Sequence, residues 1–226
     1  GLYVGLMSGT SLDALDAALV AIDDDRAELR ATHSHPLPDT LRSAIEQLCV
    51  PGLEEIDRAG PVHRRLGETF ADATLALLHE AGIAPDRIRA IGCHGQTVRH
   101  RPGPGGFSLQ LGSADCIAVR TGIPVVADFR NRDMVLGGQG APLAPRFHQF
   151  LLARTGARRA VVNIGGMANL TLLDGDQISG GFDTGPGNVL LNAWCRRHRG
   201  EPFDRDGAWA RSGRMDENLL AAMLAD

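Results

Sequence analysis

The sequence predicts an α/β fold built on a mixed sheet. Short apolar runs are joined as hairpins, helical stretches lie between these hairpins, and turn residues separate the two kinds of element. The chain has 226 residues, of which 43% are hydrophobic and 22% charged. This composition is ordinary for a soluble globular protein, and the length suggests one or two domains with a sizeable core.

The first strands are predicted from two apolar runs on either side of a polar loop. Residues 3–7 end in a Ser-Gly-Thr-Ser turn, and residues 17–22 end at the acidic turn of Asp23 to Asp25. Two such runs form a hairpin, and residues 31–36 are expected to continue the sheet.

Two helices are expected next. Residues 39–48 begin after Pro38 with Asp39 as a candidate N-cap. Residues 54–81 carry apolar side chains at helical spacing, with Gly82 as the expected stop. Gly60-Pro61 is expected to break or kink this helix. The apolar positions are Leu66, Phe70, Ala73 and Leu77, and also Leu75 and Leu78.

The remaining elements follow from turn signals and apolar runs. Strands are expected at 88–93, 97–101, 107–111, 124–127, 160–164, 167–173 and 177–180, and helices at 113–120, 145–153 and 187–198. Residues 128–140 are the candidate crossing between two lobes. We therefore expect an N-terminal lobe at 1–130 and the start of a second lobe at 131–226.

Charge and cysteine usage exclude several classes. The net charge of −4 gives no basic footprint for nucleic acid, and no run of about 18 apolar residues predicts a membrane span. The four cysteines form no CxxC pair, which fits free thiols in a reducing cytoplasm. Because Gly1 stands directly before a strand and Asp226 follows an amphipathic run without a stop signal, we expect the sequence to be a fragment.

Three glycine-rich segments have the residues for phosphate chemistry. Residues 5–13 run from a strand into a Gly/Ser/Thr turn whose N–H and hydroxyl groups suit phosphate oxygens, and Asp13 is a candidate Mg²⁺ ligand. Residues 163–171 place Gly165-Gly166 between two strands, as a second candidate phosphate turn. The alternative for both segments is an ordinary hairpin turn.

The third segment, residues 181–188, places Asp183 at a strand end before a helix. The N-terminus of that helix would favour an anion. Asp183 is a candidate general base, a Mg²⁺ ligand or only a helix cap.

Further polar segments at strand ends suit a sugar that carries a carboxylate and an amide. They are residues 94–97, 128–130 and 140–143. The alternatives are that His94 is an ordinary strand-end histidine and that Arg130 pairs with Asp128 or Asp133.

Six motifs together resemble the anhydro-N-acetylmuramic acid kinases of the actin-like sugar kinase superfamily. In order they are GLMSGTSLDALD at 5–16, GCHGQTVRHRP at 92–102, ADFRNRD at 127–133, GGQGAPLAPRFH at 137–148, NIGGMANLT at 163–171 and FDTGPGN at 182–188. The resemblance implies an actin-like ATPase (ribonuclease H-like) fold with mixed sheets and two lobes around a nucleotide cleft. The family's chains are longer, so the second lobe is expected to be incomplete here.

The resemblance also implies a reaction. ATP, Mg²⁺ and water would open 1,6-anhydro-N-acetylmuramic acid and phosphorylate O6, in a cytoplasmic homodimer that recycles cell wall. It assigns Asp183 to catalysis and, with Gln96, Thr97 and Arg130, to the substrate. The implied nucleotide residues are Gly9, Thr10, Ser11, Leu12, Asp13, Ala14, Leu15, Asp16, Gly165, Gly166 and Asn169, with Asp13 also for the metal.

The sequence departs from the family pattern at one position, and it leaves several rival functions open. Ala14 stands where family members commonly have Gly. The rivals are another actin-like sugar or polyol kinase acting on an ordinary hydroxyl, an ATPase switch of the chaperone or filament type, and a lectin-like binding domain.

Overall fold

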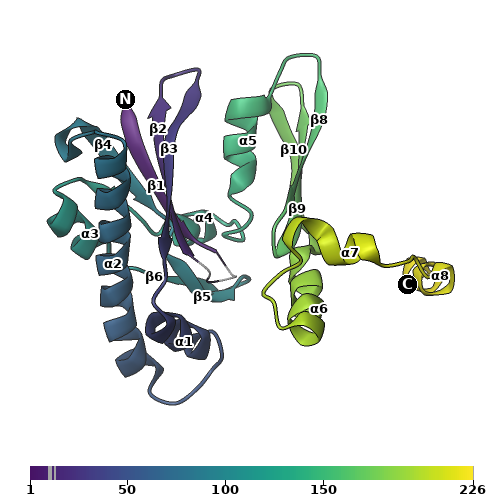
Figure 1. The fold of residues 1–226 in the computed structure, drawn as a ribbon. Helices are drawn as coiled ribbons and strands as arrows, with labels where there is room; N and C mark the ends of the chain where they lie inside the picture. The colour runs from purple at the N-terminus through teal and green to yellow at the C-terminus, as the bar shows by residue number, and fades with distance from the viewer. Residues whose placement is uncertain (10–11, 13, 226) are drawn as a thin grey trace.

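The computed structural model describes residues 1–9, 12 and 14–225 (Figure 1). Thr10, Ser11 and Asp13, to which the sequence assigns nucleotide and metal contacts, lie outside the described residues. Within the described part, the main sheet has the order β3-β2-β1-β4-β7. Its strands are β1 (Leu2–Ser8), β2 (Ala14–Ile22), β3 (Ala27–Pro36), β4 (Ile88–Cys93) and β7 (Val125–Val126).

The main sheet is mixed, as predicted. β1 pairs antiparallel with β2 and parallel with β4, and β4 pairs parallel with β7. The backbone N–H of His94 donates to the Leu6 carbonyl at 3.0 Å, which extends the β1–β4 pairing past the end of β4. Because the carboxyl ends of parallel strands share one edge, the carboxyl ends of β1, β4 and β7 lie at the same edge of the sheet.

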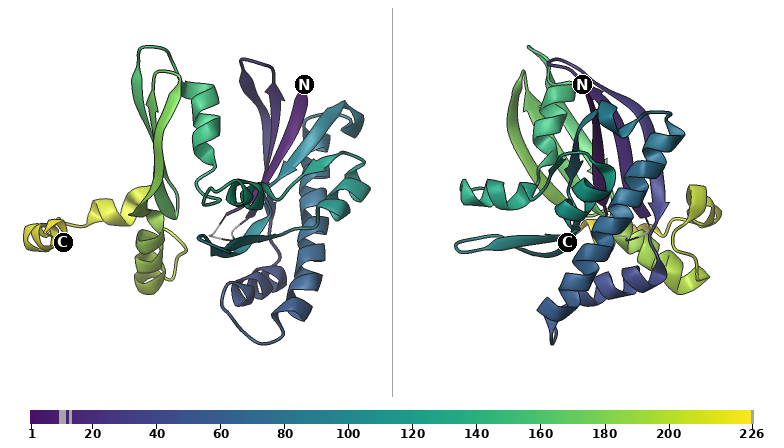
Figure 2. Two further views of the ribbon diagram at one scale, coloured as in Figure 1. Left: turned by 180° about the vertical axis from the view of Figure 1, so that it is seen from behind. Right: turned by 90° about the vertical axis from the view of Figure 1, so that its left-hand side faces the viewer.

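Three helices enclose the core on one side of this sheet. They are α1 (Asp39–Leu48), α2 (Glu55–Glu80) and α3 (Ala114–Thr121). α1 and α3 both pack against α2, which packs against β1, β2 and β3 (Figures 1 and 2). Of the predicted apolar positions of α2, Leu66, Phe70, Ala73, Leu77 and Leu78 are buried and Leu75 is half-buried. The alternating residues Val4, Leu6, Leu15 and Leu19 face these helices, and a short 3₁₀ turn, η1 (Pro85–Arg87), leads into β4.

Two expected helix details differ from the structure. α2 continues through Pro61 as one helix, because its buried apolar face outweighs the one hydrogen bond that proline removes. Pro38 occupies the N-cap position of α1, so Asp39 is the first helical residue and makes no side-chain cap. The expected stop at Gly82 is confirmed, since Gly82 adopts φ +66°.

A second sheet follows, with the order β10-β9-β8. Its antiparallel strands are β8 (Arg158–Ile164), β9 (Met167–Asp174) and β10 (Gln177–Pro186). α5 (Ala144–Leu152) packs against β9 and β10. β10 extends six residues beyond the expected end at Gly180, so Asp183 lies within this strand rather than after it.

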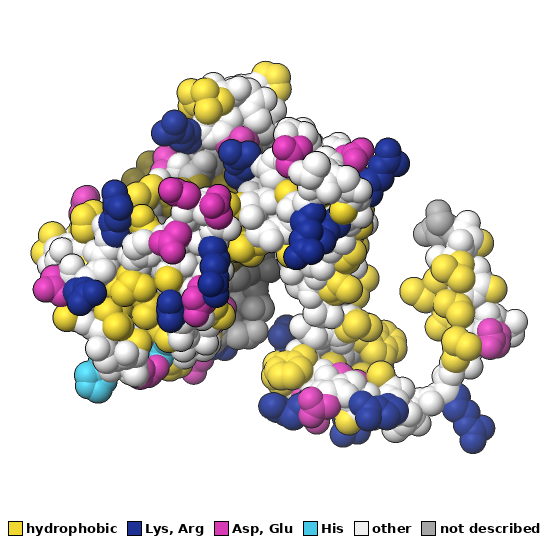
Figure 3. All heavy atoms as spheres, turned by 90° about the horizontal axis from the view of Figure 1, so that it is seen from above, with side chains coloured by type: hydrophobic (Ala, Val, Ile, Leu, Met, Phe, Trp, Pro, Cys, Tyr) yellow, Lys and Arg dark blue, Asp and Glu magenta, His cyan; other side chains and the backbone are white. Residues whose placement is uncertain are grey.

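Connecting and C-terminal elements complete the chain. α4 (Phe129–Val135) lies inside the expected crossing at 128–140 and was not predicted. The C-terminal elements are α6 (Asn188–Arg199), η2 (Arg205–Gly207), α7 (Ala208–Ser212) and α8 (Glu217–Leu224). Apolar side chains are exposed along α8, as Figure 3 shows. No helix in the described residues is both long enough and apolar enough to cross a membrane.

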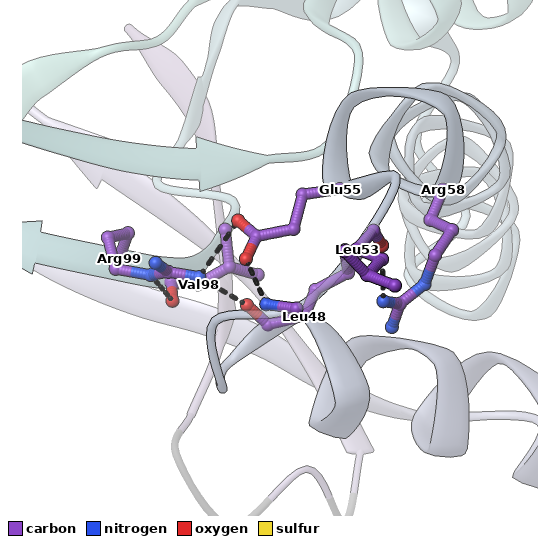
Figure 4. Close-up of polar contacts among 7 residues, drawn as sticks. Leu48, Leu53, Glu55, Arg58, Val98 and Arg99 are labelled. Carbon is purple, nitrogen blue, oxygen red and sulfur yellow. Dashed lines mark hydrogen bonds and ion pairs between the residues drawn. The ribbon is translucent and has the colours of Figure 1, made fainter.

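The hairpin of β5 (Gln96–Arg101) and β6 (Phe107–Leu111) is tied to the loop between α1 and α2. The Arg99 guanidinium donates to the Leu48 carbonyl and to the Glu55 carboxylate, both at 3.1 Å (Figure 4). Glu55 also accepts from the Gly52 backbone N–H. The Arg99 side chain is only 17% exposed, so this ion pair is shielded from water and fixes the base of the hairpin.

We expect Glu55→Gln to lower the free energy of unfolding by about 1–3 kcal/mol, because it removes the charge that a shielded Arg99 pairs with. The matched control is Glu68→Gln on the same helix. Glu68 pairs with Arg64, whose side chain is 77% exposed, so the control should cost about 0.5 kcal/mol or less. Urea denaturation of both variants measures the difference, and equal losses would contradict the role of Glu55.

We expect Gly67→Ala to lower the free energy of unfolding by about 1–3 kcal/mol through overpacking. A Cβ at Gly67 would lie 2.7 Å from the Ser113 carbonyl oxygen and 2.9 Å from Cys116 Cβ, where α2 crosses α3. The control is Gly60→Ala on the same helix, where a Cβ meets nothing within 4 Å. In this control, Ala gains about 1 kcal/mol of helix propensity over Gly. The gain is opposed because a residue with a Cβ directly before Pro61 is disfavoured in the helical conformation, so we expect a small net change. Thermal unfolding that ranks Gly60→Ala as the more damaging change would contradict the packing argument.

Candidate active site

The face of the main sheet opposite the helices carries a hollow of about 470 Å³. Strand alternation directs Gly5, Met7 and Asp16 to this face, since their neighbours along each strand are buried. Ser34 stands opposite Asp16, and His94, directly after β4, also lines the hollow. Asp16 accepts a hydrogen bond from Ser34 Oγ at 3.1 Å. The hollow therefore brings the predicted nucleotide residue Asp16 onto the same surface as the polar end of β4.

Arg130 is held between two backbone segments at one end of this surface. Its Nε donates to His94 Nε2 at 2.8 Å, and one terminal nitrogen donates to the Gly140 carbonyl at 2.7 Å. Asp133 accepts from the Gly140 N–H at 2.8 Å. The alternative of an ion pair with Asp128 or Asp133 is therefore not the arrangement found: Asp133 positions Gly140, which in turn positions Arg130.

Arg130 also lies within electrostatic range of Asp183 on the second sheet. Burial lowers the pKa of the Arg130 guanidinium, and the Asp183 carboxylate opposes this by favouring the charged form. The pKa of His100 is lowered overall, because burial and the Arg130 charge both lower it and the Asp183 carboxylate only partly opposes them. The catalytic candidate Asp183, on β10, and the substrate candidate Arg130, on α4, thus lie within electrostatic range of each other.

The β5–β6 hairpin supplies a chain of polar contacts next to these groups. Gln110 Nε2 donates to Thr97 Oγ1 at 3.1 Å and to Ser108 Oγ at 2.8 Å, and His100 Nδ1 lies 3.0 Å from the same Ser108 oxygen. Asn131 of α4 bonds both the N–H and the carbonyl of Ser108. Sequence reasoning found Thr97 but missed His100, Ser108, Gln110 and Asn131.

The register of the hairpin could have found most of these residues. Thr97 stands opposite Gln110, and His100 stands opposite Ser108, across the predicted turn at 102–106. Gln96 takes a different position: it is 2% exposed, its Nε2 donates to the Thr97 carbonyl, and its side chain lies inside the protein.

Asp183 belongs to a row of polar side chains across the second sheet. Asn163 of β8 stands opposite Asn169 of β9, which stands opposite Asp183 of β10. Paired residues on neighbouring strands project to the same face, so Asn169 lies beside the sequence-predicted carboxylate and Asn163 lies one strand further along the row. This row, one strand apart at each step, can bind hydroxyl or phosphate oxygens through the amides and accept a proton at Asp183.

The second glycine turn is bound to α6, which corrects one expectation. The backbone N–H groups of Gly187, Asn188 and Val189 donate to the carbonyls of Gly165 and Gly166, at 2.8 to 3.2 Å. The first amides of α6 are therefore occupied by the turn and do not offer the anion site expected at this helix N-terminus. The contact instead fixes Gly165-Gly166 against the helix that follows Asp183.

The described residues of the first glycine segment divide between core and surface. Leu12 and Leu15 are at most 4% exposed and join the core, so their backbone alone can reach a ligand. Gly9 accepts a hydrogen bond from the Leu12 N–H, Ala14 begins β2, and Asp16 faces the hollow.

Two further observations concern ligands. Among the described residues, no three His, Cys, Asp or Glu side chains cluster as a metal site. A hollow of about 610 Å³ between α6 and α7 is lined by Trp194 and Trp209 and contains none of the predicted site residues.

Comparison with known proteins defines the class to which this fold and site belong. A protein-family model described as anhydro-N-acetylmuramic acid kinase matches residues 1–226. Proteins named anhydro-N-acetylmuramic acid kinase from Shewanella loihica and Shewanella halifaxensis are each 52% identical over 99% of this chain and 61% of their own length. The chain belongs to the anhydro-N-acetylmuramic acid kinase family and spans about 61% of the length of the curated relatives it matches.

Solved structures show weaker likeness. A Ppx/GppA family protein from Aquifex aeolicus is 10% identical with a TM-score of 0.44, over 85% of this chain and 53% of its own. A ROK family glucokinase from Streptomyces griseus is 16% identical with a TM-score of 0.36, over 83% of this chain and 49% of its own. The actin-like fold class accordingly rests on family membership and on the mixed sheet.

Proposed function

We propose that the complete protein is an ATP-dependent kinase that opens 1,6-anhydro-N-acetylmuramic acid with water and phosphorylates O6. The products are N-acetylmuramic acid 6-phosphate and ADP. The observation that carries the proposal is that the Asp183 carboxylate of β10 lies within electrostatic range of the Arg130 guanidinium of α4. Family membership supplies the substrate class.

The chemistry assigns Asp183 to the water. O6 is an ether oxygen in the anhydro sugar and has no proton to lose. Asp183 therefore takes a proton from the water as the water attacks the anomeric carbon. The C1–O6 bond breaks, its electron pair stays on O6, and O6 bonds to the γ-phosphorus as the bond to ADP breaks.

The other residues bind and orient the reactants. Arg130 suits the lactyl carboxylate because a guanidinium presents paired donors, and Thr97 lies in the polar chain beside it. On the nucleotide side we propose the 9–16 segment, the turn at Gly165-Gly166, and Asn169. The position of Asp16 in the lining of the hollow supports the proposed nucleotide role of the 9–16 segment.

The proposed metal is Mg²⁺, bound by Asp13 together with nucleotide oxygens. Magnesium in phosphoryl-transfer sites usually takes one or two carboxylates and several phosphate or water oxygens, so a single aspartate in the turn fits its needs. When bound, it neutralises charge that develops on the transferred phosphoryl group.

We also propose that the protein acts as a cytoplasmic homodimer with two lobes, 1–130 and 131–226 onward, and that it binds neither nucleic acid nor membrane. The four thiols without a CxxC pair support a reducing compartment, and the dimer rests on the family resemblance. Light scattering of the complete protein tests the dimer, and a monomer mass at micromolar concentration would contradict it.

The function is tested by substrate choice. The complete protein with Mg-ATP should release ADP with 1,6-anhydro-N-acetylmuramic acid and form a 6-phosphorylated product by mass spectrometry. Turnover with ordinary sugars or polyols in place of the anhydro sugar would make it another sugar kinase of the same fold. ATP turnover that needs no sugar would favour the ATPase switch.

We expect Asp183→Asn to lower kcat by about 10²–10⁴-fold while the protein folds and binds ATP normally, because the amide cannot accept the proton of water. The matched control is Asp176→Asn, in the turn between β9 and β10 of the same sheet. Steady-state kinetics and calorimetry measure both variants. Near-normal kcat in Asp183→Asn would remove this residue from the mechanism.

We expect the double change Thr10→Val and Asp13→Ala to weaken ATP binding about tenfold or more, because it removes a hydroxyl donor and the metal's carboxylate. Asp24→Ala, in the exposed turn between β2 and β3, is the control. Unchanged affinity for Mg-ATP by calorimetry would contradict the nucleotide role of this segment.

A further inference from the structure

His94 is fixed in one protonation state by its two neighbours. Its Nδ1 lies 2.9 Å from the Gly95 carbonyl oxygen, and its Nε2 lies 2.8 Å from Arg130 Nε. A carbonyl oxygen can only accept and an arginine N–H can only donate. The proton of His94 is therefore on Nδ1, and the lone pair of Nε2 accepts from Arg130. Both contacts are satisfied only by the neutral ring.

The same contact sets the direction of the Arg130 guanidinium. His94 takes the Nε–H, and Gly140 takes one N–H of a terminal nitrogen. A guanidinium has five N–H groups, so three are left for a ligand. His94 follows β4, whose main-chain pairing with β1 fixes its backbone, so the imidazole is a rigid support for a long and otherwise flexible side chain.

We propose that His94 is the positioning residue for Arg130: as the neutral ring with its proton on Nδ1 it aims the guanidinium at the carboxylate of the substrate, and its protonation ends that hold. The substrate part of the proposal rests on the proposed function, whereas the hold on Arg130 does not. A protonated ring would present N–H on both nitrogens, so one donor would face another and two cations would lie side by side.

The surroundings keep His94 neutral near pH 7. Burial lowers its pKa most, the Arg130 charge lowers it further, and the bond to the Gly95 carbonyl opposes both. The other charged group among the described residues of this surface is Asp16 of β2, which lines the hollow with His94, whereas the His33 side chain of β3 pairs with Glu80 of α2 on the opposite face of the sheet. On the far side of Arg130 stand Asp183 of β10 and His100 of β5.

The sign of the pH effect follows from the lowered pKa. Between the ordinary histidine pKa near 6.5 and the lower value in the folded protein, the unfolded chain binds the proton and the folded ring does not. The contribution of neutral His94 to the free energy of unfolding is therefore fully present above this pH window and is lost as the pH falls through it. The hydrogen bond from Arg130 to His94 is lost over the same fall in pH.

Two variants of the complete protein separate positioning from packing. His94→Leu fills the space without an acceptor, and we expect KM for the anhydro sugar to rise about 10–100-fold, with KM for ATP within about twofold. His94→Gln offers an amide oxygen near the position of Nε2. It should restore most of the sugar KM and flatten the acid side of the kcat/KM profile. His79→Gln, on the exposed end of α2, is the control.

Nitrogen NMR of the complete protein, labelled at histidine and arginine, tests the hold without any assay of activity. The Arg130 signal is assigned with Arg130→Lys. We expect His94 to carry its proton on Nδ1 and the Arg130 Nε–H resonance to shift with the titration of His94.

A proton on Nε2, or an Arg130 signal that ignores the titration, would overturn the proposal, as would an unchanged sugar KM in His94→Leu. If the protein lacks the kinase activity but the two resonances titrate together, the proposed function fails and the hold of His94 on Arg130 stands.

Discussion

The parallel pairing of β1 with β4 is the constraint on which the rest of the site depends. The core stabilises this pairing on one face of the sheet, where Val4, Leu6 and Ile91 pack against α2 and its neighbours. It continues one residue past β4 through the bond from the His94 N–H to the Leu6 carbonyl. Because parallel strands end at the same edge, the carboxyl end of β1 and the polar end of β4 are adjacent by topology. His94 and then Arg130 are placed from that edge.

The polar residues of the second sheet are positioned by strand register rather than by a parallel strand pair. Its three strands are joined by tight turns, and their register alone aligns Asn163, Asn169 and Asp183 in one row. The carbonyls of Gly165 and Gly166 accept hydrogen bonds from the start of α6, which links the turn to the helix that follows the strand of Asp183. The Asp183 carboxylate from this sheet and the Arg130 guanidinium from α4 therefore come from separate parts of the fold and lie within electrostatic range of each other.

Sequence reasoning predicted the features that depend on local pattern. The apolar spacing of α2, the hairpins and the stop at Gly82 follow from periodicity and turn chemistry, and the structure confirms them. It missed α4 because Asp128 begins that helix from a left-handed backbone conformation that no capping pattern signals. It ended β10 early because Gly180 and Gly181 are poor strand formers, and pairing with β9 overrides that preference.

In the candidate site, too, local sequence patterns indicate individual residues, whereas tertiary packing determines their contacts. Asp183, Arg130 and Thr97 could be selected from strand ends and from the family resemblance. The partners that set their geometry come from elements distant in sequence: Gly140 and His94 for Arg130, and Gln110 for Thr97. The inward direction of Leu12 and Leu15, and the use of the α6 amides by a glycine turn, are likewise consequences of tertiary packing that single-sequence patterns do not contain.

The most direct test of the proposed chemistry is the fate of oxygen from water. The complete protein is given Mg-ATP and 1,6-anhydro-N-acetylmuramic acid in ¹⁸O water, and the product is read by mass spectrometry. Activation of water at Asp183 predicts one ¹⁸O at C1 of the 6-phosphorylated sugar and none in the transferred phosphoryl group. A phosphorylated product without label at C1, or label that appears only in inorganic phosphate, would contradict the proposed coupling of ring opening to phosphoryl transfer.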